Sequence, residues 1–144
     1  MAPITASTEI ARSPEDVFAY VDDVKRHTEW QTGLRTVEIL SGSGVGLKAR
    51  ETRHIPGRTM SYTYEVTEHD PPSRMAFRVL DGPVRAFGGM TITPLDGGSR
   101  SKVEFALDFE GRGLGKVLLG LVRRDARKSV PEDLRRLKGR LEGT

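Results

Sequence analysis

The hydrophobic pattern of this sequence changes its period once, at the segment Gly111-Arg112-Gly113. Ahead of this segment, apolar residues alternate with polar ones, which is the pattern of strands with one buried face. Beyond it, apolar residues recur at every third or fourth position, and this spacing predicts a helix of up to about 28 residues that begins near Leu114. A run of strands followed by a single long helix is compatible with few folds.

The alternating part of the chain is divided by turn-forming residues into seven expected strands. These are Ile4–Ala11, Leu34–Leu40, Leu47–Ile55, Thr59–Glu68, Met75–Val79, Val84–Leu95 and Ser101–Glu110. After the first strand, Ser13 and Pro14 are typical of a helix start, the serine as its cap and the proline in its first position. A second short helical turn is expected from Asp22 to about His27.

Two local features predict irregular backbone. Gly88-Gly89 interrupts the strand Val84–Leu95, which indicates a bulge or a sharp bend. Pro131 lies inside the long helix, and we expect a kink or a break within a turn of it, because the proline ring clashes with the preceding turn. Ser129 would then cap a second helical segment.

These elements predict an α+β fold of the helix-grip type. Neighbouring strands joined by short turns favour an antiparallel sheet. A twisted sheet of about seven strands curls, and one helix cannot fill its concave side. We therefore expect a seven-stranded curved antiparallel sheet that encloses a cavity with two short helices and the long C-terminal helix, all within one domain of residues 1–144.

The composition excludes several kinds of site. Cysteine is absent, which removes disulfides, thiolate zinc sites and cysteine nucleophiles. The three histidines, His27, His54 and His69, do not stand at a metal-ligand spacing, so we expect neither a metal nor a cofactor. The N-terminus does not resemble a signal peptide and no window is apolar enough to cross a bilayer. We expect a cytoplasmic protein without membrane insertion.

The net charge of +3 is unevenly distributed. Gly111–Thr144 holds 10 Lys or Arg residues against 4 Asp or Glu. Such a basic end can serve an acidic partner, as in an interaction module, or it can be the solvated face of a long helix. Acidic residues are interleaved with the basic ones, which favours the second interpretation. We expect no nucleic-acid partner, and the oligomeric state stays open.

Several short motifs, in this order along the chain, resemble the START-like or SRPBCC superfamily. They are Pro14-Glu15-Asp16-Val17-Phe18, Trp30, Gly44-Val45-Gly46, Asp70-Pro71-Pro72 and Asp133-Leu134-Arg135-Arg136-Leu137-Lys138. The resemblance covers nearly the whole chain, and it is closest to the bacterial polyketide cyclase/dehydrase group. It implies the helix-grip fold and an internal ligand cavity.

The resemblance also bears on catalysis. Aromatase/cyclases of this group are similar in carrying a tryptophan at the position of Trp30. They also carry an aromatic residue and a tyrosine at the positions of Leu34 and Val37, and an arginine at the position of Thr67. Only the tryptophan matches, which argues against ring-closing aromatase activity and leaves the catalytic residues unassigned.

Aromatic and sulfur-containing side chains on alternating strand positions suit an apolar guest in the cavity. The residues expected to bind the ligand are Trp30, Leu34, Met60, Tyr62, Tyr64, Phe77, Met90, Phe105, Phe109, Leu118 and Leu121. The alternative is that these side chains only form the core. Tyr62 and Tyr64 favour a site, because a buried phenol needs a hydrogen-bond partner that a ligand can supply. The expected ligand is a hydrophobic small molecule, polyketide-like or aromatic.

The alternative function is a cyclase or dehydrase that transfers protons in the same cavity. It requires polar groups from Glu51, Arg53, His54, Tyr62 or Tyr64 to converge on one point. Glu51 and Arg53 share one face of their strand, whereas Arg50 and His54 share the other. The alternation does not settle which pair points inward.

Overall fold

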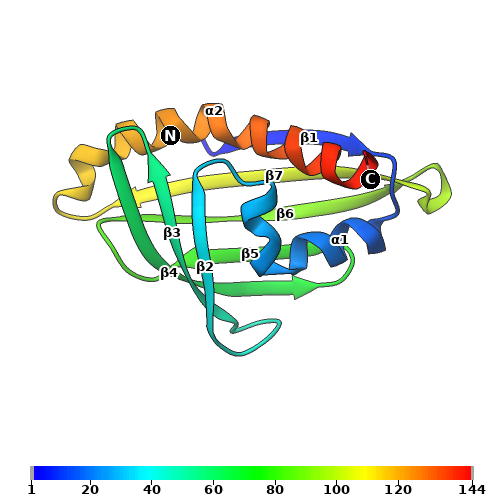
Figure 1. Ribbon diagram of the computed structural model, residues 1–144, viewed down its shortest axis with the longest axis horizontal. Helices are drawn as coiled ribbons and strands as arrows, with labels where there is room; N and C mark the ends of the chain where they lie inside the picture. Colours follow the sequence, from blue (N-terminus) through cyan, green and yellow to red (C-terminus); the bar gives the residue numbers. More distant parts are fainter. Residues whose placement is uncertain (1, 144) are drawn as a thin grey trace.

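The computed structural model describes residues 2–143, so Met1 and Thr144 of the expected domain lie outside it. Its elements confirm the predicted helix-grip fold (Figure 1). They are β1 (Ile4–Ile10), α1 (Pro14–Asp22), η1 (Val24–Glu29), β2 (Leu34–Ser41), β3 (Lys48–Ile55), β4 (Arg58–Asp70), β5 (Arg74–Val79), β6 (Val84–Leu95), η2 (Asp96–Gly98), β7 (Arg100–Gly111) and α2 (Gly115–Glu142).

The seven strands form one antiparallel sheet in the order β1-β7-β6-β5-β4-β3-β2. The first strand therefore pairs with the last, which brings the two ends of the chain to one edge. The helix α2 packs on β1, β7 and β6, and it runs along β1 and β7, whereas β2, β3 and the first part of β4 cross that direction steeply (Figure 1). The curl of the sheet leaves space between α2 and the strands beyond β6.

The short helix α1 begins as its sequence predicts. The Ser13 hydroxyl accepts a hydrogen bond from the Asp16 backbone N–H at 3.2 Å, and Pro14 occupies the first turn. Its buried face includes Val17, Phe18 and Val21, which pack in the main core cluster. The turn η1 follows directly and delivers Trp30 to the same cluster.

The helix α2 is continuous through Pro131, so the predicted break is wrong and Ser129 does not cap a second segment. The kink that was the alternative to a break stays a prediction. Buried side chains on both sides of the proline hold the helix against the sheet. They are Val122, Ala126, Val130, Leu134, Leu137 and Leu141. Burial of this stripe contributes several kcal/mol, which is comparable with the roughly 3 kcal/mol that an internal proline costs.

Of the bulge or sharp bend predicted at Gly88-Gly89, the bulge is wrong, because both glycines keep register with β5 and β7. The two positions need glycine for another reason. A Cβ at Gly88 would lie 2.2 Å from the Ala106 carbonyl oxygen, and one at Gly89 would lie 2.8 Å from the Met75 carbonyl oxygen. One of the register shifts that the sheet does contain falls between Val66 and Glu68 of β4.

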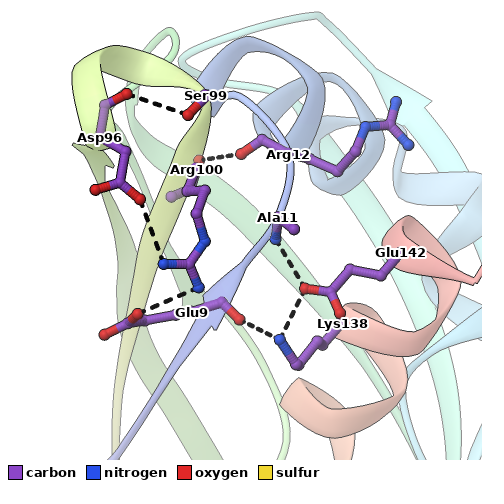
Figure 2. Close-up of polar contacts among 9 residues, drawn as sticks. Glu9, Ala11, Arg12, Asp96, Ser99, Arg100, Lys138 and Glu142 are labelled. Atoms are coloured by element: carbon purple, nitrogen blue, oxygen red, sulfur yellow. Dashed lines mark hydrogen bonds and ion pairs between the residues drawn. The ribbon is translucent and has the colours of Figure 1, made fainter.

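The last turn of α2 is tied to the end of β1 (Figure 2). The Glu142 carboxylate accepts hydrogen bonds from the Ala11 backbone N–H and from Lys138 Nζ, both at 2.7 Å. Lys138 Nζ also donates to the Glu9 carbonyl at 2.6 Å. These contacts anchor the C-terminal end of α2 on the edge strand that it covers.

Candidate functional site

A cavity of about 210 Å³ lies between the concave face of the sheet and α2. Eight of the predicted ligand-binding residues line it. They are Trp30, Met60, Tyr62, Tyr64, Phe77, Met90, Phe105 and Phe109. The helix α2 contributes Val122, Ala126 and Val130 to the cavity wall, with Asp133 and Leu134 farther along the helix. The cavity is therefore mostly apolar, with polar groups concentrated on part of its wall.

Three of the predicted residues are not among those that line the cavity. Leu34 is buried at the start of β2, and Leu118 packs half-buried beside Val122 and Ile55. Leu121 is 41 % exposed. On α2, the side that faces the sheet passes through Val122 rather than through Leu121, and Leu118, one turn before Val122, packs on that side without lining the cavity.

A group of three polar side chains converges on the cavity wall. Glu51 and Arg53 point inward from β3, and Tyr62 lies directly opposite Glu51 on β4. The Tyr62 hydroxyl donates to Glu51 Oε1 at 2.7 Å and accepts from Arg53 Nε at 3.0 Å. Burial raises the pKa of Tyr62 well above its usual value, and the Glu51 carboxylate adds to that effect, so the phenol keeps its proton.

The other pair on β3 faces outward. His54 is exposed, and its Nδ1 lies 3.3 Å from the Thr59 hydroxyl. At the surface, Arg50 Nη1 lies 3.8 Å from Asp81 Oδ2. His54 is therefore not part of the polar group that a reaction in the cavity would use.

Arg53 connects this polar group to the segment after η1 and to α2. Its guanidinium donates to Gln31 Oε1 at 2.6 Å and to the Thr32 carbonyl at 3.2 Å. The Thr32 backbone N–H in turn donates to Asp133 Oδ1 of α2 at 2.7 Å. Burial raises the pKa of Asp133, although the hydrogen bond from Thr32 opposes the rise. Arg53 makes four hydrogen bonds in all, and the longest of them, at 3.5 Å, goes to Glu51 Oε1. Few of the N–H donors of its guanidinium therefore remain free.

Three lining residues carry buried polar atoms without a hydrogen-bond partner in the described chain. These atoms are His27 Nδ1, Trp30 Nε1 and the Tyr64 hydroxyl oxygen. The His27 and Trp30 rings are neighbours, with centroids 5.5 Å apart. Trp30 and Tyr64 were predicted as site residues, but His27 was not. In the sequence, only the position of His27, three residues before Trp30 in a short helix, could have indicated that it is a site residue.

The hydrogen bond of His27 defines its tautomer. Its Nε2 lies 2.7 Å from the Val21 carbonyl oxygen. A carbonyl can only accept, so Nε2 carries the hydrogen and Nδ1 of the neutral ring is an acceptor. Burial lowers the pKa of His27, which keeps the ring neutral at physiological pH.

The charged residues of the lining are mainly acidic. Asp22, Glu51, Asp125 and Asp133 stand against one arginine, Arg53. Within residues 2–143, no group of three or more His, Asp or Glu side chains is arranged to hold a metal ion. None of the helices described is long and apolar enough to span a membrane.

The three residues at which the sequence departs from the aromatase/cyclase pattern, Leu34, Val37 and Thr67, lie outside the cavity lining. Val37 of β2 is half-buried in a small cluster with Ala49 and Tyr64. Thr67 is exposed at the register shift in β4. The polar group of Glu51, Arg53 and Tyr62 thus stands at other positions than the polar residues of the aromatase/cyclase pattern.

Comparison with solved structures gives the same fold. The Zhui aromatase/cyclase from Streptomyces sp. R1128 is 18% identical, with a TM-score of 0.84 over 96% of this chain and 92% of that one. A START superfamily protein from Mycobacterium smegmatis is 19% identical, with a TM-score of 0.81 over 98% and 97% of the two chains.

Comparison of sequences gives relatives and a family. The ribosome association toxin RatA of Vibrio cholerae serotype O1 is 30% identical over 111 residues, which is 76% of each chain. The model of the family described as polyketide cyclase / dehydrase and lipid transport matches residues 1–142. With its helix-grip sheet, its long C-terminal helix and the cavity between them, this chain belongs to the polyketide cyclase / dehydrase and lipid transport family.

Proposed function

We propose that this protein binds a hydrophobic small molecule, polyketide-like or otherwise aromatic, in the cavity between the sheet and α2. The observation that carries the proposal is the cavity itself, of about 210 Å³ with mostly apolar walls. An apolar cavity of about 150 Å³ already accepts benzene, so this one has room for a larger guest.

The kind of side chain on the walls supports an aromatic or irregular guest. Phe77, Phe105 and Phe109 offer flat ring faces, and Met60 and Met90 adapt to uneven shapes. Apolar walls with a few placed polar groups are the usual composition of small-molecule sites. Membership of a family described by polyketide chemistry and lipid transport agrees with this proposal.

The direct test is binding of N-phenyl-1-naphthylamine, a neutral dye whose fluorescence rises when it leaves water. We expect saturable binding by the wild type. Ala86→Phe, which places a ring in the cavity wall, should abolish it. Ala106→Phe is the matched control, because Ala106 is exposed on β7 and is not a lining residue. Native mass spectrometry of the gently purified wild type would identify a co-purified ligand without any variant.

Two outcomes would contradict the proposal. One is the absence of any bound compound in native mass spectrometry together with no dye binding by the wild type. The other is dye binding that Ala86→Phe leaves unchanged while circular dichroism shows that the variant is folded. The dye would then bind outside the cavity.

A second candidate function is proton transfer on a bound carbonyl compound, as in a cyclase or dehydrase. The observation that favours it is the convergence of Glu51, Arg53 and Tyr62 on the cavity wall. Glu51 Oε1 accepts from Tyr62, whereas Oε2 makes no hydrogen bond to the described chain. A buried carboxylate with one free oxygen can act as a general base toward a proton next to a ketone.

Hydrogen exchange at the carbon next to the carbonyl of 1-tetralone in D₂O tests this second candidate. Glu51 would take the proton from that carbon to give the enolate, and a deuteron from solvent would replace it. A positioned base accelerates such a step about 10²- to 10⁴-fold. Glu51→Gln should abolish the acceleration and keep dye binding, whereas the exposed Glu104→Gln should change neither. Exchange at the uncatalysed rate with the wild type would exclude this activity toward simple aryl ketones.

A further inference from the structure

The unpartnered polar atoms of the cavity wall specify what a ligand must offer. A buried polar atom without a hydrogen bond costs about 1–3 kcal/mol, and native proteins contain few of them. Here His27, Trp30 and Tyr64 each have one, and all three residues line the same cavity. Trp30 and Tyr64 are almost fully buried, at 5 % and 6 % exposure.

The three atoms have different hydrogen-bonding roles. Trp30 Nε1 can only donate, and the Tyr64 hydroxyl can donate or accept. His27 Nδ1 can only accept, because the bond from Nε2 to the Val21 carbonyl holds the hydrogen on the other nitrogen. A group that both donates and accepts, such as a hydroxyl, satisfies this combination, whereas a hydrocarbon satisfies none of it.

The charges around the cavity act against an anionic ligand. Glu51 and Asp133 are both buried, and Asp22 and Asp125 also line the wall. Arg53 is the single lining guanidinium, and its hydrogen bonds already go to Tyr62, Gln31, Thr32 and Glu51. An incoming carboxylate would therefore meet like charge without a free cation to pair with, which is costly in a low-dielectric site.

We propose, building on the ligand-binding function above, that the cavity selects neutral aromatic molecules that carry a hydroxyl group and rejects carboxylic acids of the same shape. The ligand hydroxyl donates to His27 Nδ1 and accepts from Trp30 Nε1 or from the Tyr64 hydroxyl. The Phe77 ring, which packs edge to face on Tyr64 at 6.0 Å between centroids, continues the aromatic wall on which the rest of the ligand lies.

Three compounds of one shape test this selection: naphthalene, 2-naphthol and 2-naphthoate. Their dissociation constants at pH 7.5 can be compared by isothermal titration calorimetry. At this pH naphthol is neutral and naphthoate is ionised. We expect 2-naphthol to bind about tenfold more tightly than naphthalene, because a hydrogen bond to a buried polar group is gained. We expect 2-naphthoate to bind more weakly than naphthalene.

Variants at the polar atoms show whether these residues cause the preference. His27→Phe and Tyr64→Phe keep a ring and remove the polar atom. Each should lower the affinity for 2-naphthol several-fold and leave that for naphthalene unchanged. His54→Phe is the matched control, because His54 is exposed on the outer face of β3. If His27→Phe does not fold, Tyr64→Phe carries the test alone, since the Tyr64 hydroxyl makes no hydrogen bond that folding would lose.

The outcomes separate this inference from the function on which it rests. If naphthalene binds as tightly as 2-naphthol, or naphthoate binds as tightly as either, the selection is wrong and the ligand-binding function stands. An unchanged naphthol preference in folded variants at both positions would also overturn it. If the wild type binds neither the three compounds nor the neutral dye, both proposals fall.

Discussion

The Tyr62 hydroxyl donates a 2.7 Å hydrogen bond to Glu51 Oε1 across two paired strands. The two residues lie directly opposite each other in the β3–β4 register, and both point into the cavity. Arg53 completes the group through its 3.0 Å bond to the Tyr62 oxygen. A carboxylate, a phenol and a guanidinium are thus held together on an otherwise apolar wall, where an unpaired member would be costly.

Tyr62→Phe is expected to lower the free energy of unfolding by about 1.5–3 kcal/mol, because the tyrosine hydroxyl is bonded to two charged groups. The variant keeps the ring and removes the shorter of the two hydrogen bonds to Glu51 Oε1, leaving the one from Arg53 at 3.5 Å. Urea unfolding followed by circular dichroism measures the change. A loss below about 0.5 kcal/mol would mean that water replaces the phenol without penalty.

Tyr64→Phe is expected to have the opposite effect on the unliganded protein, although the two tyrosines lie on the same strand. The Tyr64 hydroxyl is buried without a hydrogen-bond partner among residues 2–143, so its removal relieves a desolvation cost and retains the packing on Phe77. We expect the free energy of unfolding to stay the same or to rise by up to about 1 kcal/mol. A clear loss of stability in the same urea experiment would indicate that the hydroxyl is hydrogen-bonded in solution.

The half-buried ring of His27, whose Nδ1 is itself buried, is expected to make stability depend on pH between about 7.5 and 5.5. Burial lowers its pKa in the folded state, so below its unfolded value of about 6.5 the unfolded chain binds a proton that the folded protein does not. Stability therefore falls as the pH falls. The slope cannot exceed about 1.4 kcal/mol per pH unit, which is the value for uptake of one proton.

The control for this pH effect is His27→Gln, which removes the titrating ring and leaves His54 and His69 in place. The difference in the free energy of unfolding between wild type and variant should change by about 1 kcal/mol over this range. The charged groups that act on the ring are Glu51 and Arg53, whose effects oppose each other, and Asp23. Parallel pH profiles for the two proteins would show that His27 protonates equally in both states.

Glu142→Gln is expected to loosen the last turn of α2 from β1 at neutral pH. The bonds from Lys138 and from the Ala11 N–H lower the pKa of Glu142. Its contribution is therefore present above the unfolded pKa of about 4.3 and is lost as the pH falls through the lower folded value. The carboxylate is partly exposed, so we expect a loss below about 1 kcal/mol.

Amide hydrogen exchange in the last turn of α2 measures this loosening. Glu132→Gln is the matched control, since Glu132 pairs only with Arg135 of the same helix and does not reach β1. Faster exchange in Glu142→Gln at pH 7, with a difference from the control that shrinks as the pH falls below about 4.3, is the expected pattern. Equal exchange in both variants at pH 7 would mean that the apolar stripe of α2 alone holds this end.

Local patterns in the sequence were sufficient for the elements and for the kind of fold. The alternation through Met60, Tyr62 and Tyr64 of β4 and the change of period before α2 depend only on side-chain geometry within one element. The start of α1 at Ser13 and Pro14 is equally local. Eight of the eleven predicted ligand-binding residues line the cavity: strand alternation places seven of them on the concave face, and η1 delivers the eighth, Trp30.

What the sequence could not determine depends on contacts between elements. Alternation along β3 shows that Glu51 and Arg53 differ in face from Arg50 and His54, but the inward face is set by the curl of the sheet around α2. The tautomer of His27 depends likewise on the nearby Val21 carbonyl.

The helix α2 shows the same division. Periodicity located it, yet its rotation about its own axis, which exposes Leu121 and buries Val122, follows from packing on β1, β6 and β7. The same packing keeps the helix continuous at Pro131, against the local preference of proline. The sequence by itself thus determined which segments form strands and helices. Tertiary packing decided which faces meet and therefore which polar groups share the cavity, because only that packing joins residues far apart in the chain.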